Sequence, residues 1–299
     1  LPPLQRAVEL SPKRPELRAP LASALASSGD TTAAMKQIEA LLDLAPRPAD
    51  IARARQVMNR LTDPFVGFPE AARPKLEQGL EWLNKADVPQ QALVLFEEIL
   101  RDFPDFAVVH ALTGLAYQRL DDAGRAVEEF NRAIELAPRD GHAYAYLGDI
   151  YLSRQRPDAA RKAFLQALER NPLLENAHLR LGDLALERQE LPEATRRFET
   201  VKLLRPDDNT SRLKLALAKE MASDWLGAEN ELRQLLEAQP DNLELALRLS
   251  LLLAERAQRT TNVEERRTAV AEARSLLHHV LGAQPENAAA SRALETLPK

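Results

Sequence analysis

The stretch HAYAYLGDIYLSRQRPDAARKAFLQALERNP, residues 142–172, contains the pattern that decides the fold. Two runs rich in alanine, leucine and other apolar residues lie on either side of a polar turn. Gly148 lies in the first run, and Ala160 and Phe164 lie in the second. Pro172 ends the second run, since proline lacks an N–H and clashes with the preceding turn of a helix. The stretch therefore predicts two antiparallel helices of about 13 residues each.

The same pattern recurs along the chain. Prolines that end apolar helical stretches are Pro12, Pro46, Pro104, Pro138, Pro172, Pro206, Pro240 and Pro285, with separations of 34, 58, 34, 34, 34, 34 and 45 residues. If each proline is position 32 of a repeat, position 8 is small and position 24 is aromatic in the central repeats: Gly114, Gly148, Gly182 and Ala216, and Phe96, Phe130, Phe164 and Phe198. A small residue lets two helices approach closely, and no single repeat buries its own apolar face.

This pattern resembles the tetratricopeptide repeat. The matching residues of 142–172 are Leu147, Gly148, Tyr151, Ala160, Phe164, Ala167 and Pro172. The resemblance implies an all-α, right-handed superhelical solenoid of antiparallel helix pairs in 34-residue repeats. The chain departs from the family at position 4, where the usual tryptophan is replaced by His110, Tyr144, His178 and Arg212. The repeats before residue 73 and after residue 209 are degenerate.

The repeat register predicts the division of the chain. Residues 1–62 are expected to be an N-terminal degenerate block that begins in the middle of a repeat, with more protein before it. Residues 63–72 form an aromatic junction loop, and residues 73–288 form the main block of about six repeats. The last repeat carries 11 extra residues around 256–267, expected to be a long inter-helix loop or an extended helix end. Residues 289–299 are expected to be a short tail.

The junction loop overlaps the stretch TDPFVGFPEA, residues 62–71, which is unlike the helical sequence around it. Two prolines exclude a continuous helix, and Gly67 permits a tight turn. Because each phenylalanine can bury on the order of 150–250 Å², we expect Phe65 and Phe68 to dock at the block boundary. Their expected neighbours are the helix at 50–62 and the next helix, which bears Leu76. An exposed anchor for a partner and a mobile hinge are the alternatives.

Composition narrows the possible functions. The chain has 299 residues, a formal net charge of −5 and no cysteine. Scattered basic residues argue against nucleic acid, and no apolar run reaches the ~18 residues that span a bilayer. We expect a bacterial protein without direct membrane insertion, in the cytoplasm or in the periplasm of the cell envelope. A signal would not be visible in a chain that begins with leucine.

Catalytic and metal-binding patterns are lacking in the sequence. It contains no phosphate-binding glycine loop, no G-x-S-x-G and no H-E-x-x-H motif. His110 and His178 fall at position 4, where a packing role is expected, and the adjacent His278 and His279 point to different helix faces. No enzyme activity, metal or cofactor is therefore expected.

In tetratricopeptide proteins, positions 2, 5, 9, 12 and 13 line a concave groove. Carried over to this chain, the resemblance implies a partner-binding groove that includes His142, Asp149, Leu152, Asn176, Leu179, Asp183, Leu186, Leu213, Leu217, Glu220, Leu247 and Leu251. An apolar strip beside acidic residues predicts a protein or peptide partner that is amphipathic and has basic flanks. The alternative is that the fold itself covers these leucines.

The carboxylate clamp of chaperone-binding members is not expected. The positions that carry its cationic and amide side chains are Ala111, Leu115, Tyr146, Asn176 and Arg180 in this chain, and of these Arg180 alone fits. A buried carboxylate without its cations would be destabilised.

The function predicted from the sequence is a non-catalytic interaction scaffold that binds a partner helix or peptide in its concave groove. The alternative is a spacer or regulatory region of a larger protein, such as a cell-envelope export apparatus or a glycosyltransferase-like enzyme, whose activity lies outside this chain.

Overall fold

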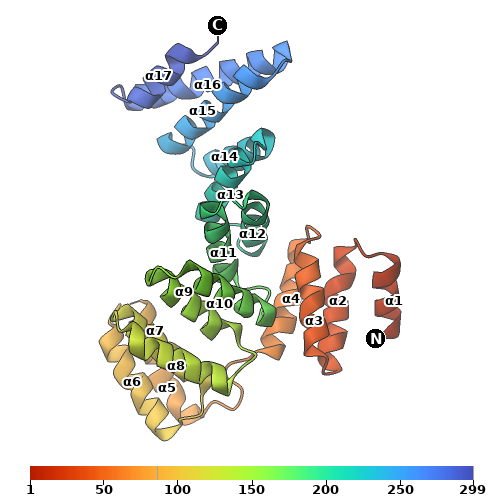
Figure 1. Ribbon diagram of the computed structural model, residues 1–299, viewed down its shortest axis with the longest axis vertical. Coiled ribbons are helices and arrows are strands. Elements are labelled where there is room, and N and C mark those ends of the chain that lie inside the picture. Colours follow the sequence, from red (N-terminus) through yellow and green to blue (C-terminus); the bar gives the residue numbers. More distant parts are fainter. Residues whose placement is uncertain (86, 299) are drawn as a thin grey trace. The chain divides into compact units, whose positions relative to one another are not determined.

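The computed structural model describes residues 1–85 and 87–298, and within these ranges it is built of 17 α-helices and two short 3-10 helices, with no strand (Figure 1). The prediction of an all-α solenoid of paired helices is thereby confirmed. The chain divides into two compact units, Leu1–Leu184 and Ala185–Lys299. The predicted boundaries at residues 62 and 73 lie inside the first unit and stay a prediction.

Unit 1 contains the N-terminal helices and the best-formed repeats. Its elements are α1 (Pro2–Leu10), η1 (Pro15–Leu17), α2 (Arg18–Ser27), α3 (Thr31–Leu42), α4 (Pro48–Leu61), η2 (Glu70–Ala72), α5 (Arg73–Asn84), α6 (Pro89–Asp102), α7 (Ala107–Arg119), α8 (Ala123–Leu136), α9 (Gly141–Ser153), α10 (Pro157–Arg170) and the first part of α11 (Glu175–Glu187). Helices α2 and α3, α5 and α6, α7 and α8, and α9 and α10 form the pairs, and α4 packs on α2.

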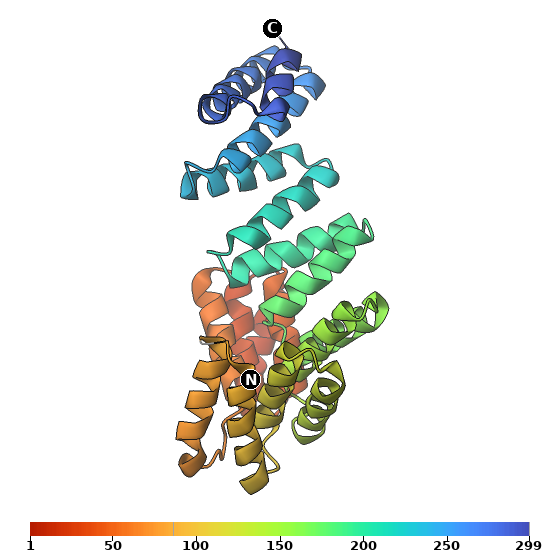
Figure 2. The ribbon, with the colours of Figure 1, turned by 90° about the vertical axis from the view of Figure 1, so that its left-hand side faces the viewer.

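Unit 2 continues with the end of α11, α12 (Leu191–Leu204), α13 (Asn209–Met221), α14 (Trp225–Ala238), α15 (Leu243–Arg259), α16 (Val263–Ala283) and α17 (Ala288–Thr296). Helices α13 and α14 and helices α15 and α16 are paired, as Figure 2 shows from the side. Leucine, alanine and valine from α13 to α17 form one core cluster in this unit.

Small residues at position 8 have a definite packing role. A Cβ atom built on Gly148 would lie 2.5 Å from the ring of Phe164, and one built on Gly114 would lie 2.6 Å from the ring of Phe130. The glycine of the first helix thus makes room for the phenylalanine of the second helix in the same repeat. Gly79, which the alignment on prolines misses by one position, has the same contact with Phe96 at 2.4 Å.

Position 4 supplies a hydrogen bond to the proline that precedes it. Arg18, His110, His178 and Arg212 each contact the carbonyl oxygen of the proline six residues earlier, at 2.8, 2.8, 2.9 and 3.1 Å. Where position 4 is tyrosine, Arg170 of the paired helix donates to the Pro138 carbonyl instead, at 2.9 Å. The substitutions for the family's tryptophan therefore keep a polar link between successive repeats, and the packing role expected for the two histidines is observed.

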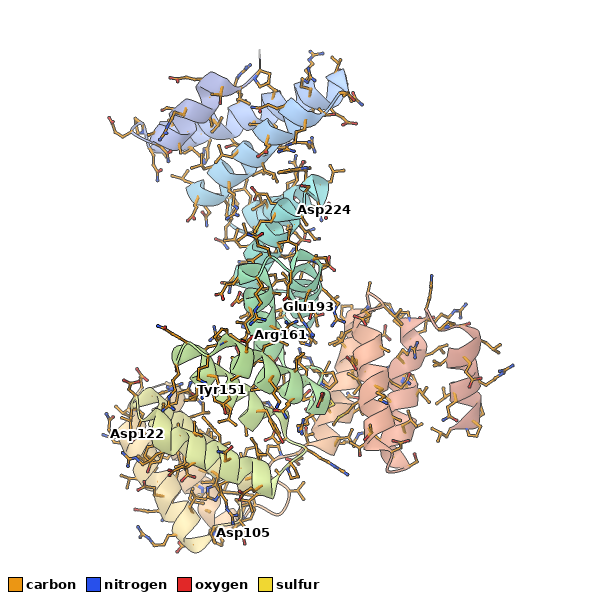
Figure 3. The ribbon with its side chains drawn as sticks, in the orientation of Figure 1. Asp105, Asp122, Tyr151, Arg161, Glu193 and Asp224 are labelled. Atoms are coloured by element: carbon orange, nitrogen blue, oxygen red, sulfur yellow. The ribbon has the colours of Figure 1, made fainter. Side chains whose placement is uncertain are left out.

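Helix boundaries follow from local chemistry. Aspartate or asparagine caps most helices that begin after a turn, and Asp122 and Asp224 accept hydrogen bonds from the first turns of α8 and α14 (Figure 3). Helices α6, α10 and α12 instead begin with proline at one of their first two positions. Both devices compensate for backbone N–H groups that have no partner inside the helix.

The junction loop partly follows the sequence prediction. Phe68 is buried and joins the core that α5 and α6 form, with its ring 5.2 Å from that of Phe106. Phe65 packs edge-on to Phe68 at 6.2 Å, but its side chain is 37 % exposed. Phe68 therefore docks against the helix that bears Leu76, as expected, whereas Phe65 stays partly exposed at the edge of the loop. The core that receives Phe68 contains residues of 68–116, so the loop is anchored on the side of the main repeats.

The degenerate C-terminal repeat is helical throughout. The 11 extra residues lengthen α15 and α16, which are 17 and 21 residues long, and the break between them is short. Extended helix ends, one of the two predicted forms, are therefore observed. The segment treated as a tail contains α17, which packs on α15 and α16 and buries Ala290 and Ala293.

Candidate partner-binding surface

The predicted groove residues of unit 1 lie on α9 and α11. Leu152 and Leu179 are half-buried, so one side of each leucine contacts the protein and the other remains accessible. Asn176 is exposed, and Asp183 is half-buried. These residues thus occupy a surface rather than the core, which the alternative of complete self-burial would have required.

Asp149 is already paired in this surface. Its carboxylate accepts hydrogen bonds from Arg180 Nε at 2.9 Å and from Asn176 Nδ2 at 3.0 Å, and both donors come from α11. The acidic character predicted here is therefore largely compensated within unit 1. The signal in the sequence was an arginine at position 6 of the following repeat, 31 residues after the aspartate.

Most of the leucines in the predicted groove lie in unit 2. Leu213 and Leu247 are half-buried and pack against the core of this unit, whereas Leu217 is half-buried outside that cluster. Leu251 is 42 % exposed. We refer to Leu213, Leu217, Leu247 and Leu251 as the leucine surface. Leu186, near the start of unit 2, is also half-buried.

The acidic residues beside the leucine surface are only partly compensated. Glu220 is paired with Arg248 at 3.5 Å, and Glu255 is paired with Arg259 at 2.7 Å. Glu244, at the start of α15, is exposed and makes no ion pair among the described residues. The four leucines and these three glutamates are all carried by α13 and α15.

A buried ionic cluster, which sequence reasoning missed, holds α13 against α12 and α14. Glu231 on α14 is almost fully buried, and its carboxylate lies 2.7 Å from Lys202 Nζ and 3.2 Å from Lys219 Nζ. Arg212 approaches the same group at 3.9 Å. A buried carboxylate is tolerated when cations surround it. The cluster connects α12, α13 and α14 and so positions the helix that carries Leu213 and Leu217.

His142 is held at the start of α9 by its own cap. Asp140 accepts a hydrogen bond from the backbone N–H of His142 at 2.9 Å, and its carboxylate lies 2.7 Å from His142 Nδ1. This hydrogen bond raises the pKa of His142, although burial opposes the change. At Asp140, burial acts to raise the pKa of the carboxyl, but the hydrogen bond with His142 and the charge of the imidazolium lower this pKa overall.

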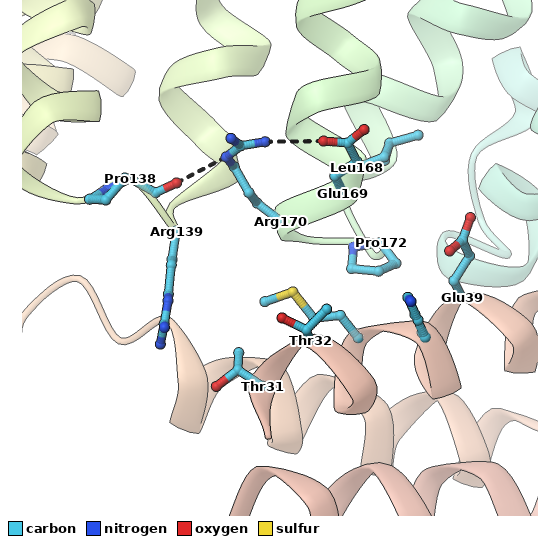
Figure 4. A pocket seen from close by; sticks show the side chains of 11 residues that line it. Thr31, Thr32, Glu39, Pro138, Arg139, Leu168, Glu169, Arg170 and Pro172 are labelled. Carbon is cyan, nitrogen blue, oxygen red and sulfur yellow. Dashed lines mark hydrogen bonds and ion pairs between the residues drawn. The ribbon is translucent and has the colours of Figure 1, made fainter. Parts of the chain in front are cut away.

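Two hollows lie in unit 1 where the N-terminal helices meet the repeat loops. The first, about 420 Å³, lies between α3 and the loops after α8 and α10, and Figure 4 shows Arg139 extending toward Thr31. The second, about 460 Å³, is lined by Met58 and Asn59 of α4, by His142, and by Asn171 and residues 173–175. The predicted groove residue His142 thus faces α4 and not an open surface alone.

None of the helices in the described ranges combines the length and the apolar character that crossing a membrane requires.

Comparisons with known proteins agree with this architecture. The tetratricopeptide repeat family model matches residues 111–175 and 146–199. The structure is similar to PilF of Pseudomonas aeruginosa, with a TM-score of 0.58 and 20 % identity over 75 % of this chain and 96 % of that one. It is also similar to YrrB, described as a tetratricopeptide protein with an unusual peptide-binding site, with a TM-score of 0.56 and 16 % identity over 67 % of this chain and 97 % of that one.

A third similar structure is PilW, a type IV pilus biogenesis factor, with a TM-score of 0.53 and 18 % identity over 76 % of this chain and 99 % of that one. No curated protein matches the chain significantly. The family model therefore identifies tetratricopeptide repeats within residues 111–199, and the similar structures share the fold over the larger part of the chain. Proteins with this fold are in general scaffolds for protein–protein interaction, and the fold implies that class of function for this chain.

Proposed function

We propose that the chain is a non-catalytic scaffold whose leucine surface binds a helix or peptide of a partner protein. The observation that carries the proposal is the exposure of Leu251 together with Leu217, which lies outside the core cluster of unit 2. Apolar side chains that form one contiguous exposed patch, unlike single scattered leucines such as Leu226, are typical of interaction surfaces. Burying such a side chain against a partner would contribute about 1.5–3 kcal/mol.

The chemistry of the surface suggests the partner. Apolar side chains at the centre favour an amphipathic helix that presents apolar residues at i, i+3, i+4 and i+7. Glu244 at the edge, without an ion pair among the described residues, favours basic residues flanking that helix. The contribution of charge is modest, because Glu220 and Glu255 are already paired. The proposed partner is therefore a protein helix or peptide recognised mainly by its apolar face.

The test begins with affinity capture by the intact chain, followed by identification of bound proteins and measurement of the dissociation constant. The test variant is Leu217→Glu with Leu251→Glu. Because neither leucine completes the core, helicity should stay unchanged, and the dissociation constant should rise at least about 100-fold, which corresponds to ~3 kcal/mol. The matched control is Leu226→Glu, at a leucine of α14 that is 68 % exposed and outside the leucine surface.

The control variant should bind like the natural chain. If the double variant binds the captured partner with unchanged affinity, the leucine surface is not the binding site. The surface of unit 1 is tested in the same way by Leu179→Glu, with Leu165→Glu on α10 as its control.

A further inference from the structure

The first observation is that helix α4 lies on a surface of the main repeats. Arg55, Met58, Asn59 and Thr62 all line the second hollow, and they are spaced i, i+3, i+4 and i+7, which is one face of a helix. The opposite wall of this hollow comes from His142, Asn171 and residues 173–175. Helix α4 thus presents one stripe to its own block, through Ile51 and Ala54, and another to the repeats.

The second observation concerns the ion pair between Arg55 and Glu175 at this seam. Arg55 Nη2 donates to Glu175 Oε1 at 2.9 Å, but the two side chains are 43 % and 28 % exposed. Ion pairs with this much solvent access contribute little to stability. In the first hollow, no hydrogen bond or ion pair joins the two walls among the described lining residues.

Packing at the seam supports the same conclusion. Two hollows of about 420 and 460 Å³, both open to solvent, lie along one seam, so the two sides are not in close contact there. The central repeats, by contrast, completely bury Phe96, Phe130, Phe164 and Phe198.

The third observation concerns the connection between the block and the repeats. The loop that follows α4 is fixed by Phe68 on the side of α5, whereas Val66 is 75 % exposed and Gly67 has a φ of 72°. The residues between Thr62 and Gly67 can therefore change their backbone angles without disturbing the anchor.

We propose that helices α1–α4 form a releasable lid, which α4 holds over the surface made by His142 and residues 173–175. Leu173 is buried and lines the same hollow as Met58, so release of the lid would expose it. The exposure of this apolar side chain favours the closed state, and the weak ion pair leaves the open state accessible. The surface is distinct from the leucine surface of unit 2, and the proposal does not depend on the proposed function.

Because the chain contains no cysteine, one introduced thiol reports lid opening. In Leu173→Cys the thiol should react slowly with a maleimide while the lid is closed. Adding Glu175→Arg places two positive charges together, and the reaction should become about tenfold faster, equivalent to ~1.4 kcal/mol. Adding Arg55→Glu to this variant restores opposite charges and should return the rate toward that of Leu173→Cys alone.

A second thiol separates lid release from unfolding. Leu181 is buried within the repeats and does not line either hollow, so Leu181→Cys should stay slow in every background. An exposed thiol in Lys162→Cys gives the maximal rate. If the thiol in Leu173→Cys reacts at the same rate in all three charge backgrounds, the proposal is wrong. It is equally wrong if the thiols at positions 173 and 181 always accelerate together, since the block would then open only by unfolding of the unit.

Discussion

At the scale of single residues, the repeat rests on the contact between a glycine and a phenylalanine. The ring of Phe164 fills the space that a side chain at Gly148 would occupy, and the same pairing recurs in neighbouring repeats. Glycine inside a helix usually costs about 1 kcal/mol relative to alanine. The fold accepts this cost because the ring is completely buried.

This contact predicts that the effect of Gly148→Ala on stability reverses its sign when the ring of Phe164 is removed. Phe164→Ala should destabilise unit 1 by about 3–5 kcal/mol, as for other large core truncations. Gly148→Ala alone should destabilise it by about 1–3 kcal/mol because the new methyl group overlaps the ring. In the Phe164→Ala background the same Gly148→Ala change should instead stabilise by up to about 1 kcal/mol. Chemical denaturation of the four variants measures all three values, and a destabilising effect of Gly148→Ala in both backgrounds would contradict the packing.

The Asp140 and His142 pair predicts a pH dependence. The pKa of His142 is raised, so its contribution to stability is complete below the unfolded value of about 6.5 and is lost as the pH rises through the folded value. The pKa of Asp140 is lowered, so its contribution is present above about 3.9 and is lost as the pH falls through the folded value. The pair should therefore stabilise α9 most between about pH 4 and 6.5.

NMR titration of the histidine side chains measures this effect. Asp140→Asn keeps a residue that caps helices well but removes the negative charge, so the pKa of His142 should decrease in this variant. The exposed His279, in unit 2, serves as an internal reference. An unchanged titration of His142 would show that the carboxylate does not stabilise the imidazolium.

At the scale of elements, the turn between paired helices has an unusual backbone. Asp121, Gln155, Gln189 and Ser223 occupy the same position of four repeats, and their φ angles are 59°, 55°, 59° and 62°. Residues other than glycine adopt this left-handed conformation at a cost of roughly 1–2 kcal/mol. Each turn therefore stores a small strain, which the packing of the two helices compensates.

Gln155→Gly should therefore stabilise unit 1. Relief of the left-handed conformation exceeds the entropic cost of glycine, and the expected gain is about 0.5–1 kcal/mol. The matched control is Arg154→Gly, because the neighbouring residue has a φ of −91° and gains nothing from glycine. Thermal unfolding compares the two variants, and a lower melting temperature for Gln155→Gly than for Arg154→Gly would contradict the argument.

At the scale of the whole molecule, the sequence predicted the features that recur with the 34-residue period. Helix pairing, turn positions and the buried faces follow from that period and from the prolines that end each second helix. Two kinds of feature could not be predicted. The ion pairs of Asp149 and Glu220 depend on residues of the next repeat, and the buried cluster at Glu231 joins three helices. Such contacts depend on distances between repeats, which periodicity does not specify.

The junction loop shows the same limit. The composition of the loop predicted that aromatic side chains are buried, but it did not distinguish Phe65 from Phe68. The structure distinguishes them, because the backbone turns at Gly67 and directs Phe68 toward Phe106 while Phe65 stays at the edge. Side-chain types alone do not show which of two phenylalanines two or three residues apart faces inward.

Serine substitutions at these rings test the anchor. Phe68→Ser should destabilise unit 1 by about 3 kcal/mol, because a buried ring is lost from the core around Leu76. Phe65→Ser should cost no more than about 0.5–1.5 kcal/mol, the range for one edge-to-face contact. Limited proteolysis should then cut Phe68→Ser faster between residues 62 and 72, while Phe65→Ser stays close to the natural chain. Equal cleavage of the two variants would mean that Phe68 does not anchor the loop, and the connection between the N-terminal helices and the repeats would need another explanation.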